Sequence, residues 1–168
     1  MPETTIDQRY SSPGAEATTW ETGERVLAGA EIYWLSTVRP DGRPHCTPLI
    51  GVWLDGAFYF STGAEERKHR NIDENRNVLV TTGTNVYATG LDVILEGVAE
   101  HVTDMDVLRR AADAYVDKYG EEWRFTPKDG HFYHAGGHGH ADVFAVRPVT
   151  GFGFGRGETY TQTRWRFA

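Results

Sequence analysis

Short runs of alternating apolar and polar residues dominate this chain, and turn-forming residues separate them. One run begins at residue 31 and ends at Pro-Asp-Gly, residues 40–42, which favours a tight turn. A second run covers residues 44–54 and closes at an Asp-Gly pair, a strong hairpin signal. Further strands are predicted over residues 57–61, 78–82, 92–102, 142–146, 151–154 and 159–167.

Three segments have helical character instead. Residues 20–29 follow Thr19, which predicts an N-cap, and residues 65–75 are charged and rich in good helix formers. Residues 105–119 carry apolar side chains at a spacing of three and four, which is typical of an amphipathic helix. The segments left without a period are a polar, flexible arm over residues 1–18 and a loop over residues 120–140.

The order of these elements predicts the fold class. Hairpins outnumber other connections, and strands do not alternate with helices as they do in a doubly wound sheet. We therefore expect a mainly β protein, an antiparallel β-barrel with peripheral helices, formed by residues 19–168.

Composition narrows the class of protein further. A chain of 168 residues with 39% hydrophobic residues can bury a core without disulfides, and its single cysteine, Cys46, favours a cytoplasmic protein. The net charge of -7 argues against nucleic acid or an anionic membrane as partner. We also expect no membrane span and no signal sequence, because no apolar stretch is long enough and the first residues lack a basic-then-apolar pattern.

Residues 61–70 combine groups that bind anions. Ser61 and Thr62 end a predicted strand, Gly63 permits a tight turn, and cations follow on the next helical turns. Hydroxyl and backbone donors with nearby arginine or lysine are typical of a phosphate site. Composition alone favours a second interpretation, a solvated helix face on which the two glutamates at residues 65–66 pair with His69 and Arg70.

A second candidate lies in residues 131–140. This segment contains His131, His134, His138 and His140, and imidazoles are good zinc ligands. The spacing falls in a glycine-rich loop rather than on one helix face, and neither a cysteine nor a paired carboxylate completes a ligand set. We therefore interpret the segment as a flexible or lid loop and predict no metal site.

Taken in order, five phrases resemble the pyridoxamine 5'-phosphate oxidase-like superfamily of split β-barrel flavoproteins, over residues 24–167. They are Trp-Leu-Ser-Thr at 34–37, Pro-Asp-Gly-Arg-Pro-His at 40–45, Phe-Tyr-Phe-Ser-Thr at 58–62 with Arg67-Lys68, Ile-Leu-Glu-Gly-Val-Ala at 94–99, and Phe-Gly-Phe-Gly at 152–155 through Arg164-Trp165. The resemblance implies an FMN-binding-like split barrel of six or seven strands. It also implies a homodimer that buries barrel faces between its subunits.

The resemblance also implies a cofactor site shared by the two subunits. Ser61, Thr62, Arg67 and Lys68 would hold the cofactor phosphate, with Lys68 on an exposed helical turn. Thr47 would lie on the strand beneath the flavin ring. Phe154 and Arg164 would approach that ring from the second subunit. The cofactor is expected to be FMN, with a deazaflavin coenzyme of actinobacterial type as the alternative.

The implied activity is that of a flavin-dependent oxidoreductase, which passes a hydride to or from a small planar substrate. The alternative is a non-catalytic protein that binds flavin, deazaflavin or a tetrapyrrole product. Cys46 and Gly51 stand where the authentic oxidase has Arg and Lys, and Tyr160 and Gln162 stand where it has Arg and His. These departures argue against phosphorylated vitamin B6 as the substrate, and no catalytic residue is identified.

Overall fold

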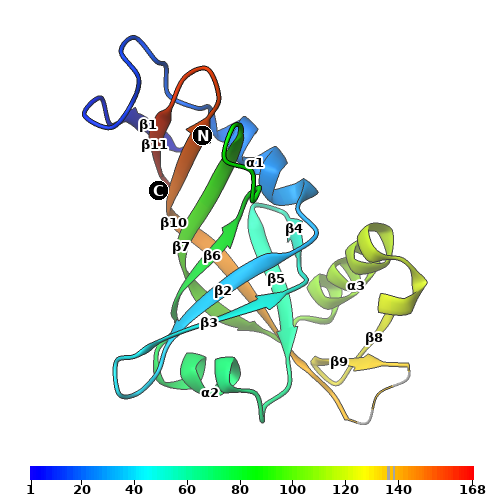
Figure 1. Ribbon diagram of the computed structural model, residues 1–168. Helices are drawn as coiled ribbons and strands as arrows, with labels where there is room; N and C mark the ends of the chain where they lie inside the picture. The colour runs from blue at the N-terminus through cyan, green and yellow to red at the C-terminus, as the bar shows by residue number, and fades with distance from the viewer. Residues whose placement is uncertain (136, 138) are drawn as a thin grey trace.

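The computed structural model describes residues 1–135, 137 and 139–168, and His138 lies outside them. In this part of the chain an antiparallel sheet of nine strands forms the body of the molecule (Figure 1). Its main path runs β1-β11-β10-β7-β6-β2-β3, while β5 pairs with β10 and β4 pairs with β5. The strands are β1 (Glu3–Ile6), β2 (Tyr33–Val38), β3 (Pro44–Leu49), β4 (Val52–Leu54), β5 (Ala57–Thr62), β6 (Asn77–Thr82), β7 (Gly90–Val102), β10 (Asp142–Arg156) and β11 (Thr161–Arg166).

The mainly β architecture is therefore confirmed, with more strands than the six or seven expected. Three helices surround the sheet: α1 (Trp20–Gly29), α2 (Arg67–Glu74) and α3 (Met105–Tyr119). The side chain of Thr19 caps α1 as predicted, and Asp104 caps α3. Among the described residues, no helix is long and apolar enough to cross a membrane.

One prediction about an irregular segment is wrong. Residues 120–140, expected to be a loop, contain a short helix, η1 (Glu121–Trp123), and a hairpin of β8 (Phe125–Lys128) and β9 (His131–His134). Stacked Phe125 and Phe132 rings, 4.7 Å apart, attach this hairpin to the core beneath α3. The segment has no regular apolar period, so its sequence pattern did not predict that Phe125 and Phe132 are core residues.

The N-terminal arm is also not without structure, because β1 pairs with β11 over four residues. The hydroxyls of Ser11 and Ser12 then accept hydrogen bonds from the backbone N–H groups of Gln162 and Tyr160, at 3.0 and 2.9 Å. The sequence pattern did not reveal this pairing, because edge-strand pairing uses backbone groups and needs no apolar period.

Strand alternation divides the apolar side chains between two cores. Phe58 and Phe60 of β5 face the barrel interior, where they pack with Trp165, whereas Tyr59 faces Tyr115 of α3 on the other side. Because successive side chains point to opposite faces, one strand serves both cores. Each large side chain buried in this way contributes about 1.5 to 3 kcal/mol.

A β-bulge at Val149 changes the alternation in β10. Before the bulge, Phe144 and Val146 face the barrel interior. The register with β7 then shifts between Pro148 and Thr150, so that one residue of β10 has no partner. After the bulge, the interior positions are Gly151 and Gly153, which pack against the Trp165 ring. Phe152 and Phe154 point outward.

Candidate functional site

Thr62, at the end of β5, and Lys68, in the first turn of α2, both contact the carboxylate of Glu66. The Thr62 hydroxyl donates to Glu66 Oε1 at 3.1 Å, the Gly63 N–H donates to the same oxygen at 3.0 Å, and the Lys68 ammonium pairs with Oε2. We call Thr62, Gly63, Glu66 and Lys68 the anion corner. The donors that the sequence assigned to a phosphate thus converge on a carboxylate of the chain itself.

Lys68 is buried, contrary to the expectation of an exposed helical turn: its side chain is 11% exposed. Partial burial raises the pKa of Glu66, but hydrogen bonds from Lys68, Gly63 and Thr62 outweigh that effect and hold this pKa below its ordinary value. Glu66 is therefore ionised at neutral pH, and its negative charge is paired with the Lys68 ammonium within the corner.

The other two residues predicted for the phosphate lie differently. Arg67 is exposed at the start of α2, and its charge acts on His45 of the neighbouring hairpin. Ser61 lies on the face of β5 opposite to Thr62, because adjacent strand residues alternate. The contacts described above thus unite Thr62 and Lys68 and do not include Ser61 or Arg67.

Two further residues, to which the sequence gave no role at the phosphate, complete the surroundings. Burial and the positive charges of Arg39, Lys68 and Arg67 lower the pKa of His45 on β3. The Nε atom of Arg39 is buried and has no hydrogen-bond partner among the described residues. Both residues belong to the β2–β3 hairpin, and the signal for them was the Pro-Asp-Gly-Arg-Pro-His phrase, which ends at His45 and which Arg39 directly precedes.

Thr47 lies on the same side of β3 as His45, one alternation further along the strand. It stands opposite Leu35 of β2, while His45 stands opposite Thr37. Leu35 and Thr37 are both buried, and the Asn71 amide of α2 donates to the Thr37 hydroxyl at 2.9 Å. The side of the β2–β3 hairpin that carries His45 and Thr47 therefore leads from α2, next to the anion corner, to Thr47.

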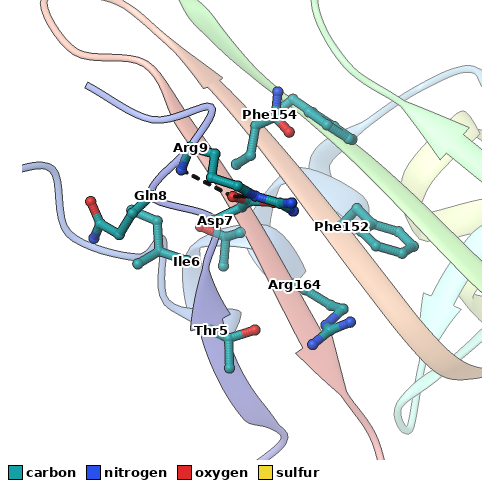
Figure 2. Close-up of a pocket in the computed structure, with 10 residues that line it drawn as sticks. Thr5, Ile6, Asp7, Gln8, Arg9, Phe152, Phe154 and Arg164 are labelled. Atoms are coloured by element: carbon teal, nitrogen blue, oxygen red, sulfur yellow. Dashed lines mark hydrogen bonds and ion pairs between the residues drawn. The ribbon is translucent and has the colours of Figure 1, made fainter. Parts of the chain in front are cut away.

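Phe154 and Arg164 lie at the other end of the barrel, where they line one cavity of about 510 Å³ (Figure 2). Arg164 stands opposite Phe152, and Gln162, opposite Phe154, lines the same cavity. The N-terminal segment closes one side: Asp7 and Arg9 form an ion pair at 2.7 Å beside these residues (Figure 2). Hydrogen bonding to Arg9 holds the pKa of Asp7 below its ordinary value.

The two groups of residues cannot meet on one cofactor within one chain. Thr62 stands opposite Asp142 at the start of β10, and Phe154 is near the other end of the same strand. Twelve residues of strand span up to about 40 Å. Figure 1 likewise shows α2 and the β10–β11 turn at opposite ends of the sheet.

The comparisons with known proteins cover nearly the whole folded chain. The family model described as pyridoxamine 5'-phosphate oxidase matches residues 20–151. No curated protein matches the sequence.

Solved structures share the fold at low sequence identity. A heme binding protein from Mycobacterium smegmatis has a TM-score of 0.67 and 18% identity, over 88% of this chain and 59% of that one. An FAD binding protein from the same organism has a TM-score of 0.55 and 19% identity, over 89% and 96%. A protein titled F420 reductase has a TM-score of 0.53 and 25% identity, over 76% and 94%.

Proposed function

We propose, from the premise that this chain belongs to the pyridoxamine 5'-phosphate oxidase family, that it is a flavin-class oxidoreductase. Its cofactor is FMN or a deazaflavin coenzyme, and its substrate is a small planar molecule that accepts or donates a hydride. The solved structures with the same fold include proteins named for FAD, F420 and heme, which supports the cofactor class more than the particular cofactor.

The observation that carries this proposal is the carboxylate in the anion corner. A hydroxyl, a backbone N–H and a buried ammonium already surround one anionic group, Glu66, and these donors also suit a phosphate. The buried Nε of Arg39, without a partner among described residues, offers one more donor nearby in the β2–β3 hairpin. The residues present therefore fit a phosphate-bearing cofactor.

The chain has three tasks in this function. Thr62, Gly63 and Lys68 would hold the phosphate once the exposed Glu66 side chain has turned away, and Thr47 would contact the ring. The Phe154 and Arg164 pair of the second subunit would approach that ring and would exclude water from it. The cofactor itself supplies the hydride chemistry.

A homodimer is part of the proposal, because the two halves of the site lie too far apart in one chain. The outer face of the sheet supports it: Trp34 and Val149 are 49% and 56% exposed, although both are large and apolar. Cross-strand pairing through Thr81 and Ile94 connects Trp34 to Phe152, so this face is continuous with the Arg164 half-site. Light scattering at micromolar concentration should give twice the chain mass, and a monomer would contradict the shared site.

Titration of the purified protein with FMN and with a deazaflavin coenzyme, followed by fluorescence, tests the cofactor. If neither binds with a Kd below about 100 micromolar, the proposal fails. A panel of quinones, nitro compounds and biliverdin with the reduced cofactor then tests turnover. Tight binding with no turnover across the panel would favour the alternative, a carrier of flavin, deazaflavin or a tetrapyrrole product.

A further inference from the structure

Three residues from distant parts of the sequence meet beside α2. His101 is the second-last residue of β7, His131 begins β9, and Asp142 begins β10. A ring nitrogen of each histidine and a carboxylate oxygen of Asp142 all lie within 4.8 Å of one another. We call these three residues the His-His-Asp cluster.

The distances within the cluster are close to those of a metal site. His131 Nδ1 lies 2.7 Å and His101 Nε2 lies 3.6 Å from the same oxygen, Asp142 Oδ1. Ligands at 2.0 to 2.1 Å from a tetrahedral zinc ion lie about 3.3 Å from one another. The two distances to Asp142 Oδ1 differ from this value by less than 1 Å, so small side-chain movements would turn the three atoms toward one ion.

The second carboxylate oxygen of Asp142 is hydrogen-bonded to a residue outside the cluster. His69 Nε2 of α2 lies 2.7 Å from Asp142 Oδ2, and His69 Nδ1 lies 3.1 Å from Asp73. A metal-ligating group is usually fixed by an outer hydrogen bond of this kind, which orients it toward the ion. The Asp142 side chain is 15% exposed, whereas that of His101 is 41% exposed and leaves the cluster open to solvent on its side.

We propose that His101, His131 and Asp142 bind a divalent transition metal ion of the zinc class. Two imidazoles and one carboxylate are a common ligand set for such ions, and the fourth position is left for water or for His140. The His140 ring centroid lies 4.1 Å from that of His131. The ion would join the β9–β10 segment to the end of β7.

This site differs from the histidine motif of the sequence. His134 does not join the cluster: its Nε2 lies 2.8 Å from the carbonyl oxygen of Glu122, and its ring packs on Trp123 and Phe125. The ligands instead combine one residue of the motif with two that lie on long strands. His134 is therefore a matched control in the same hairpin.

The test uses untagged, full-length protein freed of metal with a chelator. We expect Co²⁺ alone to give the visible d–d bands of a tetrahedral site and Zn²⁺ to displace it at one ion per chain. Zn²⁺ should also raise the Tm. His101→Ala and His131→Ala should weaken Zn²⁺ binding at least tenfold, and His69→Ala about tenfold. His134→Ala should bind Zn²⁺ as the unaltered protein does.

His101 is partly exposed, so His101→Ala is expected to fold, and its circular dichroism spectrum is the check. Absence of saturable binding in the unaltered protein would overturn the proposal, because the cluster would then be a hydrogen-bonded network only. Equal loss in His134→Ala and His131→Ala would overturn it too. None of these measurements uses flavin binding, so the result is independent of the proposed function.

Discussion

The anion corner and the His-His-Asp cluster lie on neighbouring strands, yet they are built in different ways. Thr62 in the corner stands directly opposite Asp142 in the cluster, and α2 serves both through Lys68 and His69. The corner comes from one stretch of seven residues, 62–68. The cluster comes from three strands, and its residues 101, 131 and 142 span about forty residues of sequence, with α3, η1 and β8 between the first and the second.

This difference explains what could be read from the sequence. A strand end, a tight turn and a first helical turn fix the relative positions of their side chains, so the corner was visible as a motif. The cluster depends on tertiary pairing, because His101 and Asp142 approach one another only when β7 and β10 align. Local pattern contains no such information.

The two regions also differ in how firmly their carboxylates are held. Asp142 is 15% exposed and receives two imidazoles, whereas the Glu66 side chain is 51% exposed. We therefore expect Asp142 to be a permanent part of the structure and Glu66 to be replaceable by a ligand.

The largest expected effect is that of Asp142→Ala on stability. The substitution removes hydrogen bonds to His69 and His131, both at 2.7 Å, and should lower the free energy of unfolding by about 3 kcal/mol. Urea denaturation with a chelator present measures this value. Glu66→Ala is the comparison and should cost less than half as much; equal losses would show that the two carboxylates are held alike.

Lys68→Ala should have the next largest effect, on cofactor affinity. A hydrogen bond from a charged group contributes about 1.5 to 3 kcal/mol, so the FMN dissociation constant should rise about tenfold to a hundredfold. Arg70→Ala is the control, because Arg70 pairs with the exposed Glu65. Equal losses in both variants would mean that the phosphate does not bind in the anion corner.

Glu66→Gln should have a smaller effect of opposite sign. The amide oxygen can still accept from Thr62 and Gly63, but the negative charge that competes with a phosphate is gone. FMN should bind about threefold to tenfold more tightly, as isothermal titration can measure. Weaker binding would indicate that Glu66 supports the ligand rather than giving way to it.

The smallest expected effect is on the stability of the fold at acid pH. Partial burial raises the pKa of Asp142, but hydrogen bonds from His69 and His131 outweigh it, so this pKa lies below its ordinary value of 3.8. The folded protein thus binds fewer protons than the unfolded chain near that pH. The stability that the ionised Asp142 carboxylate contributes is fully present above pH 3.8. It is lost as the pH falls through the pKa of Asp142 in the folded protein.

Asp142→Asn should therefore flatten the acid side of the curve of Tm against pH. Glu66→Gln should flatten it less, although the pKa of Glu66 is also lowered, because the Glu66 carboxylate is more exposed. If the curve of Tm against pH flattened more in Glu66→Gln than in Asp142→Asn, Glu66 would be the more firmly held of the two carboxylates.

The same contrast between local and tertiary information holds for the fold. Alternation, turns and caps predicted the helices and most strands, because those signals are local. Residues 44–54 were predicted as one strand, whereas the structure divides them at Gly51, which lies against Phe58 with no room for a side chain. The pairing of β1 with β11 and the anchoring of Phe132 beneath α3 likewise depend on surfaces that exist only in the folded molecule.

The bulge at Val149 has an evolutionary consequence. Val149 is 56% exposed within one chain, so its replacement by another apolar residue, which keeps the proposed dimer face apolar, should be tolerated. Its deletion would restore simple alternation and leave the following side chains on their present faces, with Gly151 and Gly153 still against the Trp165 ring, which a side chain at Gly153 would approach within 2.5 Å. Substitutions and the loss of one codon can therefore both be absorbed at this position over time, because the bulge lets β10 gain or lose one residue without exchanging the faces of the half-strand that follows.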